Sequence, residues 1–175
     1  MKQMFSRAVI TLVALAALTA LILPAMASAA VTPSKDEQRV MDLINTQRTK
    51  HDLPELVMNT DLVRSSGGHS AQMADKKYFS HDSNNGESFG DRIVRYGYTK
   101  TGYSSWHVGE NIYWGTGLYS TPVAVVRAWM GSSAHRAVIL DAKAREFGVG
   151  KTFTESFKGH KNVSLYTLDT GARTK

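Results

Sequence analysis

Gly109-Glu110-Asn111-Ile112 lies between two segments that carry histidines. Upstream are His69-Ser70 and Tyr78-Phe79-Ser80-His81, and downstream the run from Trp129 to Arg136 contains His135. One acid between two well-separated histidines is compatible with a metal site, an acid/base site or solvated surface chemistry. The patterns in the neighbouring segments are needed to distinguish these three kinds of site.

The pattern around this stretch predicts helices first and strands last. Apolar residues at helical spacing, with capping residues before them, predict helices over about 35–50, 60–77, 88–96, 122–130 and 133–140. Alternating or apolar runs predict an extended segment over 110–114 and strands over 147–153 and 162–168. Positions 98–109 are expected to form a loop. Helices followed by strands favour an α+β domain, or a layered α/β/α domain.

Local signals mark where several helices begin. Ser34 followed by Glu37 predicts a capping box, and Thr121-Pro122 predicts a capped helix with proline at its first position. Ser133 is expected to cap the short helix that carries His135. Gly67-Gly68 costs the second helix about 1 kcal/mol per glycine relative to alanine, and it lets another backbone come close.

The first residues have the pattern of an export signal. Lys2 and Arg7 precede an apolar run, and Ala27-Ser28-Ala29 fits a signal-peptidase site. We therefore expect a signal peptide at 1–29, a lead-in at 30–35, one domain at 36–170 and a tail at 171–175. The protein is expected to be secreted, extracellular or in the cell envelope. The membrane would be met only through an uncleaved signal segment.

Composition excludes several function classes. The chain has 175 residues, a net charge of +6 and no cysteine, so thiol nucleophiles and thiolate metal sites are excluded. Without residues 1–29 the charge is +4, because that segment holds two cations and no acid. No basic run with interleaved aromatics occurs, so a nucleic-acid partner is not expected. A modest positive charge favours anionic wall polymers or lipid headgroups instead.

Five motifs follow one another along the chain: His69-Ser70, Tyr78 to His81, Gly109 to Ile112, Val125 to Leu140, and Gly148-Val149-Gly150. In this order they resemble the bacterial, cysteine-free branch of the CAP superfamily. This superfamily contains the cysteine-rich secretory proteins, antigen 5 and the pathogenesis-related 1 proteins. The resemblance covers about residues 36–168 and implies an α/β/α sandwich.

The resemblance also implies a cleft with two histidines and two glutamates. His69 matches the first histidine, Glu110 the glutamate and His135 the second histidine. Ser132 stands where the family has its second glutamate, so the set of four is incomplete. Val138 is a further departure, because the bacterial pattern has asparagine there.

Neutral imidazoles are good ligands for zinc and related ions. His69 and His135 are therefore candidate metal ligands, although they lack the tight spacing of a helical zinc motif. Glu110 is a candidate general base, but we favour a structural role in which it fixes the tautomer of a cleft histidine while Asn111 ties the segment down. His81 is a candidate at the cleft rim, and Ser132 lies near His135.

Three further aromatic residues near the site are compatible with an apolar wall for a ligand or with ordinary core packing: Trp106, Tyr113 and Trp114.

Three functions are compatible with this pattern. The favoured one is a monomeric, non-enzymatic binding module whose cleft takes an ion, a small ligand, a lipid or a cell-wall component. The first alternative is a metal-dependent hydrolase of peptides or wall polymers, with Glu110 as base. The second is a structural module of the envelope or spore coat. Zinc is the candidate cofactor.

Overall fold

A computed structural model describes residues 31–175, so the predicted signal peptide lies outside the described residues. The expected helices are all present, but two of the four strands of this described part lie between helices, and only the other two follow the last helix. The helices are α1 Lys35–Thr49, α2 Thr60–Lys76, α3 Phe89–Arg95, the short 3₁₀ turn η1 Gly117–Ser120, α4 Pro122–Gly131 and α5 Ser133–Ile139. The strands are β1 Val57–Met58, β2 Ser105–Thr116, β3 Glu146–Phe157 and β4 His160–Thr174.

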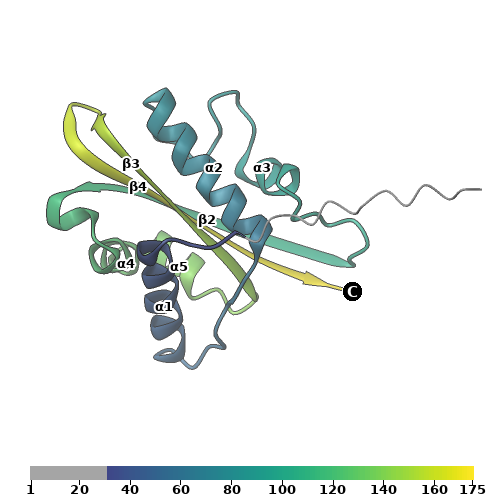
Figure 1. The fold of residues 1–175 in the computed structure, drawn as a ribbon. Helices are drawn as coiled ribbons and strands as arrows, with labels where there is room; N and C mark the ends of the chain where they lie inside the picture. The colour runs from purple at the N-terminus through teal and green to yellow at the C-terminus, as the bar shows by residue number, and fades with distance from the viewer. Residues whose placement is uncertain (1–30) are drawn as a thin grey trace, which may run out of the picture.

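The four strands form one sheet in the order β1-β3-β4-β2. β4 pairs antiparallel with both β3 and β2, whereas the two-residue β1 runs parallel to β3. β2 is therefore an edge strand over its whole length. Figure 1 shows α2 and α3 on one side of the sheet and α1, α4 and α5 on the other. The predicted α+β class and the three-layer arrangement are confirmed.

Most of the predicted helix starts are confirmed. Ser34 and Glu37 form the capping box of α1, and Thr121 caps α4 with Pro122 at its start. The structure also shows Asn59 as the cap of α2. The prediction for α5 was one residue off, because Ser132 occupies the N-cap position and its side chain makes no capping hydrogen bond.

The strands are longer than the sequence indicated. Positions 105–109, expected to be loop, are the first half of β2, and residues 171–174, expected to be a tail, extend β4. The two segments pair with each other from Ser105↔Thr174 onward. Strand formation there depends on this distant partner, which a local pattern cannot reveal. The short strand β1 was missed for the same reason.

α2 lies unusually close to the sheet. A Cβ added to Gly150 would fall 2.2 Å from the backbone nitrogen of Gly67, and one added to Gly148 would fall 2.2 Å from that of Val63. Glycines on β3 therefore let the helix backbone approach the strand directly. This contact fixes the height of α2, and of the loop after it, above the sheet.

Candidate functional site

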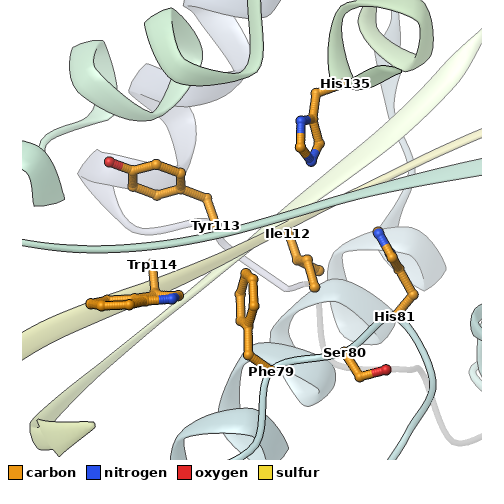
Figure 2. Close-up of a pocket in the computed structure, with 7 residues that line it drawn as sticks. All are labelled: Phe79, Ser80, His81, Ile112, Tyr113, Trp114 and His135. Atoms are coloured by element: carbon orange, nitrogen blue, oxygen red, sulfur yellow. The ribbon is translucent and has the colours of Figure 1, made fainter. Parts of the chain in front are cut away.

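A cavity of about 470 Å³ lies at the edge strand β2. Phe79, Ser80 and His81 of the loop after α2 form one side, and His135 of α5 forms the other. Residues 112–114 of β2 cross between them, with Tyr113 and Trp114 at the apolar end (Figure 2). The cavity thus spans both helical layers around one strand.

Glu110 lies beside this cavity but is enclosed. Its side chain has no exposed surface, and its carboxylate accepts a hydrogen bond from His81 Nδ1 at 2.8 Å. The other carboxylate oxygen forms an ion pair with Arg92. Because Nδ1 donates to Glu110, the lone pair of His81 is on Nε2 in the neutral ring. Glu110 therefore orients a histidine, in the role that the sequence favoured for it.

Arg92 holds this arrangement together. Its buried guanidinium pairs with Glu110 and donates to the carbonyl oxygen of His81 at 3.1 Å and to Ser83 Oγ at 2.9 Å. One side chain from α3 thus fixes both the carboxylate on β2 and the loop that carries the histidine. The sequence contained a signal for it. Arg92 has helical spacing with Phe89, Ile93 and Tyr96, and a cation at such an inward position indicates a buried acidic partner.

His81 is the histidine that lies at the cavity on this side. Its side chain is 49% exposed. The hydrogen bond to Glu110 raises the pKa of His81, with burial opposing the rise. At pH values near neutrality its ring therefore carries more positive charge than a free histidine would.

His135 faces His81 from the opposite wall. Figure 2 shows the two rings extending toward each other from either side of β2. Burial lowers the pKa of His135, and the charge of His81 lowers it further. Asn111 Nδ2 donates to the carbonyl oxygen of His135 at 2.9 Å. Asn111 thus ties α5 to β2 and places His135, a more specific role than the expected fixing of a loop.

His69 does not line the cavity. It is fully buried on α2, with its Nε2 2.9 Å from the carbonyl oxygen of Ser80. Burial lowers the pKa of His69 to about 4, so the ring is neutral and supports the loop from beneath. The structure therefore places His81, and not His69, opposite His135. The expected pair of His69 and His135 is not brought together, because His69 turns into the protein interior.

Of the other residues predicted for the site, some line the cavity and some do not. Ser132 is half-buried at the start of α5 and is not among the residues that line the cavity. Tyr113 and Trp114 line it, as the hypothesis of an apolar wall requires. Trp106 packs instead against the cluster of Leu62, Ile93 and Tyr98.

Asp169 is an acid that the sequence analysis missed. It lies directly across from Glu110 in the β2–β4 register and has no exposed surface. Burial, followed by the neighbouring Glu110, raises the pKa of Asp169 well above its ordinary value. The alternation of Val163, Leu165 and Thr167 could have found it, because the next residue on that face is Asp169.

The residues present do not form a three-ligand metal site. Within positions 31–175, no group of three or more histidine, cysteine, aspartate or glutamate side chains is placed to hold an ion. Two imidazoles reach the cavity, and the nearby carboxylate is committed to Arg92 and His81. The described residues at the cavity thus offer two imidazole ligands and no free carboxylate.

Comparison with known proteins places the chain in a family. The family model described as the cysteine-rich secretory protein family, CAP, matches residues 41–166. The Bacillus subtilis protein YkwD is 37% identical over 123 residues, which cover 70% of this chain and 45% of YkwD. The Bacillus subtilis membrane protein YlbC is 32% identical over 125 residues, which cover 69% and 34% of the two chains. This chain thus spans less than half the length of either relative.

Solved structures of other bacterial proteins have the same fold. An extracellular protein of Bacillus anthracis that contains an SCP domain is 31% identical, with a TM-score of 0.62 over 85% of this chain and 45% of that one. An outer surface protein of Borrelia burgdorferi shares the fold, with a TM-score of 0.64 at 17% identity over 82% and 97% of the two chains. No helix within residues 31–175 is long and apolar enough to cross a bilayer. Because the family model covers most of the sequence, the chain belongs to the cysteine-rich secretory protein, or CAP, family.

Proposed function

We propose that this protein is an exported binding module whose cavity takes a small ligand with an apolar body and an anionic head group. The observation that carries the proposal is the division of the cavity at β2. Phe79, Ile112, Tyr113 and Trp114 line one part of it, and His81 and His135 line the other. Binding sites for small molecules have this composition, with a mainly apolar wall and a few polar groups that fix orientation.

The charge of the polar end favours an anion. Glu110 is already neutralised by the buried Arg92, and its hydrogen bond raises the pKa of His81. A protonated His81 can donate from Nε2, and charge-assisted hydrogen bonds of this kind contribute about 1.5–3 kcal/mol. An exported protein with a positive net charge would also attract anionic ligands.

The enclosure of Glu110 favours binding over hydrolysis. A general base has to reach the proton that it removes, directly or through one water molecule. The Glu110 side chain has no exposed surface and both of its oxygens are engaged. The hydrolase hypothesis with Glu110 as base therefore gains no support from this geometry.

Two probes with the same indole body and opposite head groups test the proposal. Indole-3-acetate is expected to shift NMR resonances of His81, His135 and Trp114, while tryptamine binds at least about tenfold more weakly, a factor that corresponds to about 1.4 kcal/mol. His81→Ala should lower the affinity for indole-3-acetate by about the same factor. His51→Ala is the matched control, because His51 is exposed and bonds only within α1 and the turn after it.

Binding should also persist in the presence of a chelator, since the proposed contacts are hydrogen bonds from the imidazoles and apolar packing. Equal affinities for the two probes, or shifts confined to other surfaces, would show that the cavity is not an anion-selective site.

A further inference from the structure

Asp169 and Glu110 form a buried pair of acids beneath the cavity. They are directly opposite each other on neighbouring antiparallel strands, so their side chains point to the same face of the sheet, at close range. That face is covered by α2 and α3. Neither acid has access to solvent through its side chain.

The charges around this pair do not balance if both acids are ionised. Arg92 from α3 forms its ion pair with Glu110. From α2, Ser65 and His69 face the pair, and burial lowers the pKa of His69 to about 4, so that this ring is neutral. His81 bonds to the Glu110 carboxylate and is half-exposed. On the other neighbour of β4, the residue opposite Asp169 is Gly148, which brings no charge.

The surroundings of the Asp169 carboxyl group point to the same imbalance. Within residues 31–175 neither of its oxygens has a hydrogen-bond partner of good geometry, and the nearby donor is the hydroxyl of Ser65, whose oxygen is itself without a well-aligned partner. One serine hydroxyl compensates poorly for burying an ionised carboxylate, which is strongly unfavourable. The group next to it is the Glu110 carboxylate, which can only accept. A proton on Asp169 would turn this contact between two acceptors into a hydrogen bond.

We infer that Asp169 holds a proton and donates it to Glu110, which makes Asp169 a positioning residue for the Glu110–His81 pair. The two acids then carry one negative charge, which the Arg92 guanidinium neutralises. Glu110 is held from three sides, by Arg92, His81 and Asp169. The site thus contains a second acid, on β4, although Ser132 occupies the position where the family resemblance implied one.

The location of the proton can be measured on the unmodified protein. Carbon-13 NMR of the assigned side-chain carboxyl groups at pH 7 should show Asp169 at the chemical shift of a protonated acid. A carboxylate shift for Asp169 at that pH would overturn the inference. This measurement does not depend on ligand binding. An ionised Asp169 would therefore leave the proposed function standing, and a failure of ligand binding would leave the inference about Asp169 standing.

Two variants separate a shared proton from simple burial. In Glu110→Gln the neighbouring negative charge is removed and an amide donor replaces it, so Asp169 should move to the carboxylate shift at pH 7. If Asp169 stays protonated in this variant, burial alone holds the proton and the sharing is refuted.

Asp169→Asn keeps a neutral donor next to Glu110. The pKa of His81, followed by NMR, should therefore stay within about 0.3 of the parent value, whereas Glu110→Gln should lower it by about 1. A fall of about 1 in Asp169→Asn as well would mean that Asp169 is ionised in the parent, and would overturn the inference.

Discussion

His69 and His81 show how residue environment separates two side chains that look similar in sequence. His69 lies on α2 among the buried residues Leu62, Val63 and Met73, which an apolar helical pattern already indicated. His81 lies in a polar loop, where a histidine is usually unremarkable. The family resemblance assigned His69 to the cleft, whereas His81 lines the cavity. The difference depends on the contact of α2 with the sheet and on Arg92 of a later helix, which the sequence motifs do not show.

The buried His69 predicts a loss of stability in acid. An unfolded histidine has a pKa near 6.5, and the pKa of His69 is lowered to about 4 by burial. As the pH falls, His69 is therefore protonated in the unfolded chain at a higher pH than in the folded protein. The contribution of His69 is fully present above pH 6.5 and is lost between pH 6.5 and 4, to a total of about 3 kcal/mol.

Urea unfolding at pH 7.5 and pH 4.5 measures this effect. Between the two pH values, the free energy of unfolding should fall by about 2–3 kcal/mol less in His69→Gln than in the parent protein. His51→Gln, which changes an exposed ring, should follow the parent. An identical decline in the parent and in His69→Gln would show that this histidine does not stay neutral in the folded protein.

Arg92, the cation beside Glu110, is expected to make a large contribution to stability. Arg92→Met leaves a fully buried carboxylate without its counter-charge, which typically costs about 3–5 kcal/mol. Arg95→Met, on the same helix, removes an ion pair whose arginine is half-exposed and should cost under about 1 kcal/mol. Chemical denaturation of both variants at pH 7 compares them. Equal, small losses would mean that Arg92 does not hold the site together.

At the scale of elements, the helices were predictable because their signals are local. Capping residues and apolar spacing lie within one segment, and they located α1, α2 and α4 to within a residue or two. The strands depend on partners far along the chain. Ser105 to Gly109 has little strand character of its own, yet it pairs with residues 170–174. Asp169 was missed for a related reason, since its importance comes from the residue opposite it on β2.

The contact between α2 and β3 predicts opposite effects for two glycines that face each other. A Cβ at Gly67 meets nothing within 4 Å, so Gly67→Ala should stabilise the protein by about 0.5–1 kcal/mol through helix propensity. A Cβ at Gly150 would meet the backbone of Gly67 at 2.2 Å. Gly150→Ala should therefore destabilise the protein by about 2 kcal/mol or more, because neither backbone can move away cheaply.

Thermal unfolding of the two variants distinguishes these cases, with an increase in Tm for Gly67→Ala and a decrease for Gly150→Ala. Similar changes in both would mean that the helix does not lie directly on the strand.

At the scale of the whole molecule, the cavity belongs to no single layer. The loop after α2 brings His81 from one side of the sheet, α5 brings His135 from the other, and the edge strand β2 passes between them (Figure 2). The fold as a whole therefore sets the separation of the two imidazoles. The sequence could predict the family and the fold. It also indicated Tyr113 and Trp114 as an apolar wall. It could not place this wall relative to His81 and His135, since the lining residues come from three separate segments.

The central claim is that a protonated His81 binds an anionic head group, and the pH dependence of affinity tests it most directly. Because the hydrogen bond to Glu110 raises the pKa of His81, the ring loses its proton at a higher pH than an ordinary histidine does. The affinity for indole-3-acetate, measured by calorimetry between pH 6 and 9, should fall by about tenfold or more across that loss. His81→Gln should bind weakly at every pH. An affinity that does not change with pH in the parent protein, or that falls equally in His81→Gln, would contradict the account.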